Sequence, residues 1–177
     1  MCVQVVEPKT GQRFPEKGLS RLGVRYKGPI KVYAVGEYDD GNYMLKMSYG
    51  VGAQKMTSAL ADALKPRCSD AKLIEEFEAC LLKGLPNGAP KGTKMTFSTG
   101  GGKLKVAVND KQVGVVGSKV LASAFANIYC DRNAVCTMEA VGADGEVAAG
   151  GGGGLLTPLR GAAIGAVAGY GIGKAFS

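Results

Sequence analysis

The chain has 177 residues, 46% of them hydrophobic, which is enough to bury the core of one domain with some sequence left over. It carries 22 lysine and arginine residues against 15 aspartate and glutamate residues, and the resulting charge of +7 favours anionic partners in general. It has no histidine, which excludes Ser–His and Cys–His catalytic pairs and removes the commonest metal ligand, so we expect neither a metal nor a cofactor.

Two strands, 30–38 and 43–49, are expected on either side of residues 39–42, because Asp-Gly and Gly-Asn pairs are typical of hairpin turns. In the first strand Tyr33, Val35 and Glu37 alternate with a purely aliphatic set, so the two sets point to opposite faces. The position of Tyr33 therefore suits a cleft between the sheet and its helices.

Two helices are predicted next, because apolar residues recur at helical spacing over residues 56–64 and 73–82. Pro66 ends the first helix, and Ser69 is the expected N-cap of the second. Three strands and one further helix follow, at residues 95–97, 104–108, 113–115 and 120–128. Segregated blocks of strands and helices predict an α+β fold, an open-faced antiparallel β-sheet with helices packed on one face.

The composition changes after residue 140, which predicts a domain at 1–140, a glycine-rich linker at 141–154 and a tail at 155–177. Four tail glycines fall at every fourth residue and would give a helix the smooth groove of a glycine zipper: Gly161, Gly165, Gly169 and Gly173. The 13 residues from Gly161 to Gly173 would make about 20 Å of helix. This is shorter than the hydrocarbon core of a bilayer, which is about 30 Å thick. The tail could lack fixed structure, dock on a partner helix, associate with a membrane or a membrane complex, or span a membrane.

The five cysteines are odd in number and have no metal-binding spacing, which argues against a disulfide framework and a zinc site, although Cys130 and Cys136 could pair across a turn. The lysines are scattered and no nucleic-acid-binding signature is present, so we expect no nucleic-acid partner. The chain begins with no recognisable signal peptide or transit peptide, which leaves a reducing compartment such as the cytoplasm open.

The most informative stretch is Leu22-Gly23-Val24-Arg25, followed by the strand 30–38. This wording, GVR-x-K and then KVYAVG-x-Y, resembles the chalcone isomerase-like family, and in particular its non-catalytic fatty-acid-binding branch. Other similar pieces stand in the family's order along the chain: residues 6–11 before this stretch, and residues 74–77, 85–88, 94–97, 102–106 and 119–125 after it. The resemblance implies a plastid protein that binds a fatty acid or a similar apolar carboxylate.

The resemblance implies that Arg25 holds the carboxylate and that Tyr33 donates a hydrogen bond to it. Arg25 lies eight positions before Tyr33, closer than in longer family members, and an alignment without a gap would put Arg21 in its place. The alternative from the residues alone is that Arg25 pairs with Glu37 or Asp39. Candidate cavity-lining residues, each of which could equally be ordinary core, are Val35, Met47, Met56, Leu60, Phe77 and Phe125.

Two other functions stay open at this point. A chalcone-flavanone isomerase, an intramolecular lyase, would need a tyrosine and an asparagine on the helix, where the alignment places Gly52 and Ala59. A structural subunit of a membrane protein complex, anchored by the glycine-zipper tail, is the second alternative. The missing helix residues favour binding without catalysis.

Overall fold

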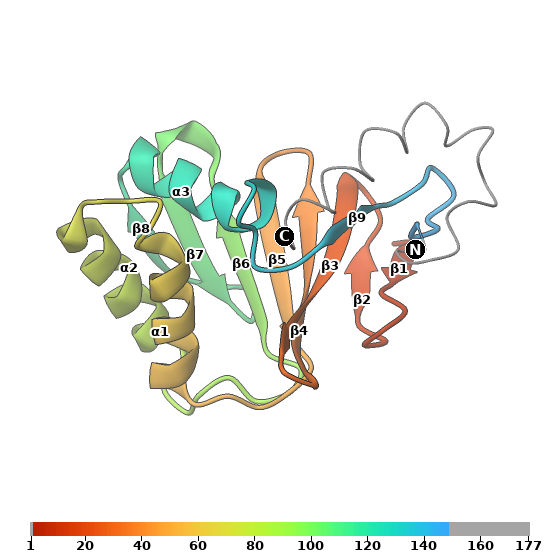
Figure 1. The fold of residues 1–177 in the computed structure, drawn as a ribbon, viewed down its shortest axis with the longest axis horizontal. Helices are drawn as coiled ribbons and strands as arrows, with labels where there is room; N and C mark the ends of the chain where they lie inside the picture. The colour runs from red at the N-terminus through yellow and green to blue at the C-terminus, as the bar shows by residue number, and fades with distance from the viewer. Residues whose placement is uncertain (1, 149–177) are drawn as a thin grey trace. The chain divides into compact units, whose positions relative to one another are not determined.

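The computed structural model, which describes residues 2–148, contains one seven-stranded antiparallel sheet with three helices on one face (Figure 1). The strand order across the sheet is β8-β7-β6-β5-β4-β3-β9, and a separate two-stranded hairpin, β1-β2, packs on the other face. The predicted α+β class, with an open antiparallel sheet and helices on one face, is therefore confirmed.

The large sheet consists of β3 (Leu19–Lys27), β4 (Ile30–Tyr38), β5 (Asn42–Met47), β6 (Lys94–Ser98), β7 (Leu104–Val108), β8 (Lys111–Val116) and β9 (Met138–Ala140). The small hairpin is β1 (Gln4–Val6) and β2 (Arg13–Pro15). The helices are α1 (Ala53–Leu64), α2 (Ala71–Gly84) and α3 (Lys119–Cys130), and a short 3-10 turn spans Gly100–Gly102.

Local sequence explains the end of α1 and the start of α2. The α1 helix stops before Pro66, as expected, because proline has no N–H to donate to the helix. The N-cap of α2 is Asp70 and not Ser69: its carboxylate accepts hydrogen bonds from the amides of Lys72 and Leu73. A carboxylate at this position also meets the positive end of the helix dipole.

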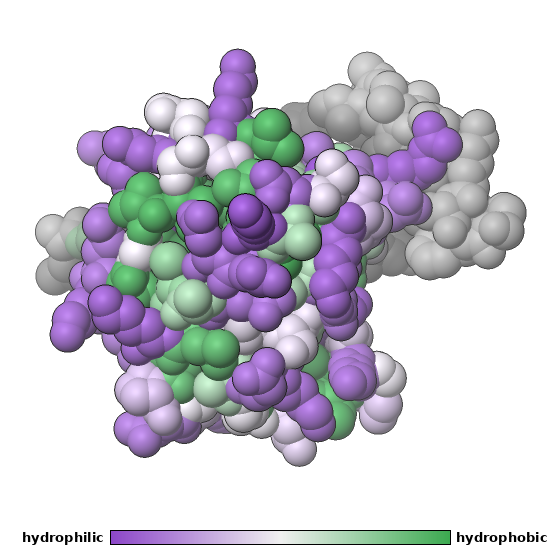
Figure 2. All heavy atoms as spheres, turned by 90° about the vertical axis from the view of Figure 1, so that its left-hand side faces the viewer, coloured by the Kyte–Doolittle hydropathy of each residue, from purple (hydrophilic) through white to green (hydrophobic). Residues whose placement is uncertain are grey.

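The two faces of the sheet carry separate cores. Between the sheet and the helices lies a large apolar cluster that includes Val35, Phe77 and Phe125. On the opposite face Phe14 of the β1-β2 hairpin covers Ala34, in a smaller cluster. The outer side of α1 and α2, seen in Figure 2, is mostly hydrophilic with apolar side chains scattered among the polar ones.

An irregularity in the β3-β4 pairing decides which residues share a face. At the turn, Tyr26 pairs with Lys31, but one step further Arg25 pairs with Tyr33, so Val32 is an extra residue in β4. A β-bulge of this kind shifts the register by one residue and moves every later side chain to the other face. Without it, Arg25 and Tyr33 would lie on opposite sides of the sheet.

The described chain continues a little beyond the predicted domain boundary at residue 140. Val141 and Val147 form an isolated bridge and pack against the smaller apolar cluster, so the first residues of the predicted linker join the packed structure. The rest of that linker and the glycine-zipper tail lie outside the described residues and stay predictions. Within residues 2–148, no helix is both long and apolar enough to cross a bilayer.

Candidate functional site

Arg25 on β3 and Tyr33 on β4 lie directly opposite each other in the antiparallel ladder. Residues opposite each other share a face, and Tyr33 belongs to the cluster beneath the helices, so both residues are on the helix side of the sheet. Tyr33 is buried, and Arg25 is half-buried. The structure thus brings together the two residues that the sequence analysis paired.

The hydroxyl of Tyr33 lies 3.1 Å from the hydroxyl of Tyr129, which comes from α3. Burial raises the pKa of both phenols well above their usual value, so each stays neutral and keeps its proton. In such a pair one hydroxyl donates to the other, and the acceptor retains a proton that it can donate elsewhere. Tyr129 is a site residue that the sequence analysis did not identify, because its position on α3 gave no sign of contact with β4.

Arg25 has a single hydrogen bond within residues 2–148: its Nη1 donates to the carbonyl oxygen of Val135 at 3.0 Å. No carboxylate of the described chain lies within ion-pair distance of it. Val135 belongs to the segment 131–137, which connects α3 to β9 and packs its Val135 and Cys136 side chains on the main core. A guanidinium with five N–H donors is therefore held by one neutral acceptor.

Arg21, the alternative candidate, already has a carboxylate partner. Its Nε and Nη2 donate to the two carboxylate oxygens of Glu37 at 2.8 and 2.7 Å, and its Nη2 also lies 3.2 Å from Sγ of Cys130. The Tyr43 hydroxyl donates to Glu37 as well, at 3.0 Å. Burial alone would raise the pKa of Glu37, but these hydrogen bonds outweigh it and lower that pKa to about 2.

The predicted pairing of Arg25 with Glu37 or Asp39 is therefore not what the structure contains, since Glu37 belongs to Arg21. The two arginines share one face of β3, four residues apart, and they differ in their partners. Arg21 is neutralised within the fold, whereas Arg25 is the one whose charge the described chain leaves without a counter-ion.

The six candidate cavity-lining residues all belong to the main core, and each side chain is at most 2% exposed: Val35, Met47, Met56, Leu60, Phe77 and Phe125. The aromatic rings among them pack closely; the centroids of Phe97 and Phe125 are 4.4 Å apart. Thr57, which follows Met56 in α1, is also fully buried, and its hydroxyl has no hydrogen-bond partner within residues 2–148. These residues line the space beside Tyr33 as packed core.

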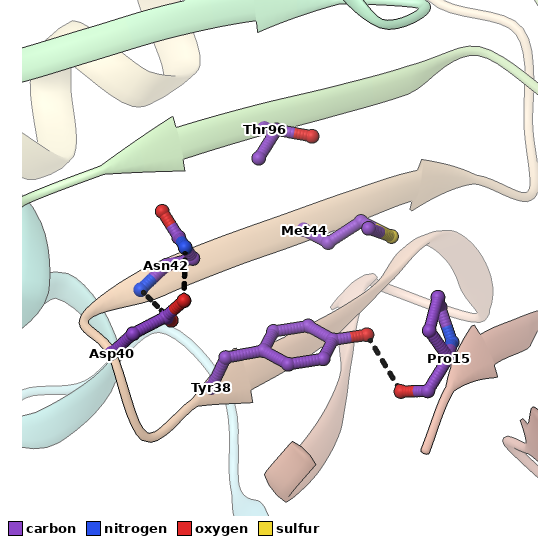
Figure 3. Close-up of a pocket in the computed structure, with 6 residues that line it drawn as sticks. All are labelled: Pro15, Tyr38, Asp40, Asn42, Met44 and Thr96. Carbon is purple, nitrogen blue, oxygen red and sulfur yellow. Dashed lines mark hydrogen bonds between the residues drawn. The ribbon is translucent and has the colours of Figure 1, made fainter. Parts of the chain in front are cut away.

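A separate hollow of about 270 Å³ lies on the opposite face of the sheet (Figure 3). Its lining residues come from the β4-β5 hairpin and the strands beside it, and they are Pro15, Tyr38, Asp40, Asn42, Met44 and Thr96. The Tyr38 hydroxyl donates to the carbonyl of Pro15 at 3.1 Å. Since Arg25 and Tyr33 are on the helix side, this hollow is not the predicted cleft.

The helix positions that an isomerase would use do not face the arginine-tyrosine pair. Gly52 is the N-cap of α1 and has no side chain to offer, and Ala59 is exposed on the outer side of the helix. Within residues 2–148 there is also no cluster of three or more acidic or cysteine side chains that could hold a metal ion.

A second ion pair fixes the segment that covers Arg25. Arg67, just after α1, donates from Nε and Nη2 to the two oxygens of Asp131 at 2.8 and 2.9 Å, and from Nη2 to the carbonyl of Asn133 at 2.8 Å. The Arg67 side chain is only 8% exposed. Sequence reasoning missed this contact because the two partners are 64 residues apart and belong to no motif.

No protein-family model matches the sequence, and no curated protein matches it either. Among solved structures, the crystal structure of a fatty-acid binding protein of Arabidopsis thaliana matches with a TM-score of 0.60 and 22% sequence identity. The match covers 72% of this chain and 88% of that chain, and that protein is chalcone isomerase-like. The resemblance expected from the sequence is thus confirmed at the level of the fold. This chain has the chalcone isomerase-like fold.

Proposed function

We propose that this protein binds a fatty acid or a similar apolar carboxylate without transforming it. One observation carries the proposal. The guanidinium of Arg25, on the helix side of the sheet, donates to one backbone carbonyl and pairs with no carboxylate of the described chain. A ligand carboxylate would replace the Val135 carbonyl as the acceptor, and the Tyr33–Tyr129 pair would supply one further O–H. The similarity in fold to a fatty-acid binding protein supports this choice of ligand.

The acyl chain would occupy the space between the sheet and the helices. That space is now filled by its own side chains, so binding requires the segment 131–137 to move outward and the core to repack. Met47 and Met56 suit such repacking, because unbranched thioether side chains adapt to irregular shapes. The hydroxyl of Thr57, which has no hydrogen-bond partner within residues 2–148, marks a place in this core where hydrogen bonding is not satisfied.

The carboxylate head and the acyl chain of the ligand would contribute different amounts to the binding free energy. Burying ten methylene groups contributes about 8 kcal/mol before entropy costs, whereas a hydrogen bond to a charged group contributes about 1.5–3 kcal/mol. The chain of the acid would therefore set most of the affinity, and Arg25 would set its orientation.

Two measurements on the purified chain test the proposal. Native mass spectrometry is expected to find an apolar acid that co-purifies, and calorimetric titration with laurate is expected to show saturable one-to-one binding. If no acid co-purifies and laurate produces no saturable heat, the proposal is wrong. We also propose a plastid as the compartment, on the resemblance alone, and imaging of a fluorescent fusion of the full-length protein tests it.

A further inference from the structure

Three loops meet at one end of the sheet, along the lower edge of Figure 1. They are residues 26–31 around the β3-β4 turn, residues 48–55 leading into α1, and residues 86–93 leading into β6. A β-bridge between Val51 and Ala89 joins the second loop to the third, and the amides of residues 48 and 49 donate to the carbonyl of Val32, next to the first. We call these three loops the basic end.

The basic end carries four lysines and no aspartate or glutamate. All four are exposed, and none forms an ion pair with any residue of the described chain: Lys27, Lys31, Lys55 and Lys91. Asp110, in the turn between β7 and β8, is already paired with Lys94. More than half of the net charge of +7 is thus gathered on three neighbouring loops and left without counter-ions.

The same loops expose large apolar side chains. Tyr26, Ile30 and Tyr49 are 39%, 37% and 52% exposed, and they are three of the seven large hydrophobic residues that the described chain leaves exposed. Tyr26 and Ile30 both lie in the last two residue pairs of the β3-β4 hairpin, beside Lys31 and Lys27 respectively. Exposed apolar side chains at the tip, with lysines beside them, give this end of the sheet an amphipathic surface.

We propose that the basic end docks on the surface of an anionic lipid bilayer. Lysines near a membrane surface are attracted by its negative potential, and tyrosine rings settle at the headgroup level because one end is apolar and the other polar. An aliphatic tip such as Ile30 gains by entering the acyl boundary, whereas it gains nothing on a phosphate backbone. The basic end also has no arginine, the residue preferred for phosphate and base recognition in nucleic acids.

The inference goes beyond the proposed acid site and stands on different residues. The two are adjacent, since Arg25 directly precedes Tyr26 on β3. A protein docked in this way would hold Arg25 close to the lipid surface, and apolar acids partition into that lipid.

Co-sedimentation of the full-length protein with vesicles tests the inference. We expect binding to phosphatidylcholine vesicles that contain about 30% phosphatidylserine, and little binding to phosphatidylcholine alone. The pair of changes Lys27→Gln and Lys31→Gln should weaken binding to the anionic vesicles about tenfold or more. The pair Ile30→Ser and Tyr49→Ser should weaken it several-fold at unchanged charge.

Matched controls come from the opposite end of the sheet. Lys103→Gln with Lys119→Gln removes the same charge, and Val120→Ser removes an exposed apolar side chain, so neither should change vesicle binding. The inference is overturned if the two double lysine variants weaken binding equally. It is also overturned if neither variant weakens binding while the parent protein still binds, because another part of the chain would then make the attachment. It is overturned as well if the parent binds no vesicle, or if Lys27→Gln with Lys31→Gln abolishes binding to single-stranded RNA and leaves vesicle binding intact. Laurate titration of the same variants is independent of all these outcomes.

Discussion

At the scale of single residues, the two arginines of β3 show why a partner matters more than a position. Arg21 and Arg25 share a strand, a face and a charge, yet only Arg21 meets a carboxylate. In the sequence, Arg25 is preferred to Arg21 as the ligand-binding arginine because Leu22-Gly23-Val24 precedes it. The pairing of Arg21 with Glu37 depends on the bulge at Val32. The sequence does not reveal this bulge, because residues 33–37 alternate in the same way whether or not an extra residue precedes them.

The Glu37 carboxylate should make stability depend on acid. Its pKa is about 2 in the folded protein and near the ordinary value of 4.5 in the unfolded chain, so the unfolded chain binds more protons between these values. The stabilisation is present above pH 4.5 and is lost as the pH falls toward 2. Between pH 5 and pH 2.5, urea denaturation should show the parent losing about 1–3 kcal/mol more than the variant Glu37→Gln.

Other groups that titrate in this range, such as Asp131, are common to both proteins and cancel in the comparison. Parallel stability curves for the parent and Glu37→Gln would contradict the assignment of this ion pair.

At the scale of elements, the segment 131–137 and β9 close over the arginine-tyrosine pair. Gly23 makes the close approach possible: a Cβ at this position would lie 2.6 Å from Sδ of Met138 and 2.7 Å from the carbonyl oxygen of Thr137. The Thr137 carbonyl is backbone and cannot rotate away. Gly23, part of the family motif in the sequence, therefore packs against Met138 of β9, which lies 115 residues further along the chain. No local sequence pattern predicts this contact.

The variant Gly23→Ala should loosen this cover without unfolding the protein. Burial raises the pKa of Cys136 to about 12, so its thiol is neutral and reacts slowly while the segment is in place. In Gly23→Ala we expect the thiol reagent iodoacetamide to label Cys136 several-fold faster, as measured by mass spectrometry of the Cys136 peptide. Gly117→Ala is the control, because a Cβ there meets nothing within 4 Å. Equal labelling rates of Cys136 in the parent, Gly23→Ala and Gly117→Ala would mean that Gly23 does not keep the segment 131–137 packed on the sheet.

The ion pair of Arg67 with Asp131 should anchor the start of the same segment. Arg67→Gln removes two hydrogen bonds to a carboxylate from a buried side chain, and we expect the free energy of unfolding to fall by about 2–3 kcal/mol in urea. Lys65→Gln, which breaks the exposed pair with Asp62, should change stability little. A loss no larger than that of Lys65→Gln would show that the anchor contributes nothing.

At the scale of the whole molecule, much of the architecture could be predicted from the sequence. Hairpin turns, proline stops and helical spacing located the three helices and the five strands from β4 to β8, because local residues determine each of them. The short strand β9 could not be predicted: three residues, Met138–Ala140, pair only because the exposed edge of β3 is there to receive them. Contacts of this kind depend on the assembled fold.

The candidate site divides in the same way. Arg25 and Tyr33 came from the sequence through the resemblance, and the structure puts them opposite each other. Tyr129 and the Val135 carbonyl complete the site, and they come from α3 and the segment after it, about 100 residues further along the chain. A backbone carbonyl leaves no trace in the sequence, so this part of the site required the structure.

The most direct test of the account compares an acid with an alcohol of the same chain length. Arg25→Gln removes the charge at similar volume, and it should weaken laurate binding about tenfold to a hundredfold, as measured by calorimetry. Binding of dodecanol, which has no carboxylate, should be nearly the same in the parent and the variant. The control Arg13→Gln, at an exposed arginine of β2, should leave laurate binding unchanged. Equal laurate affinity in the parent and in Arg25→Gln would contradict the account.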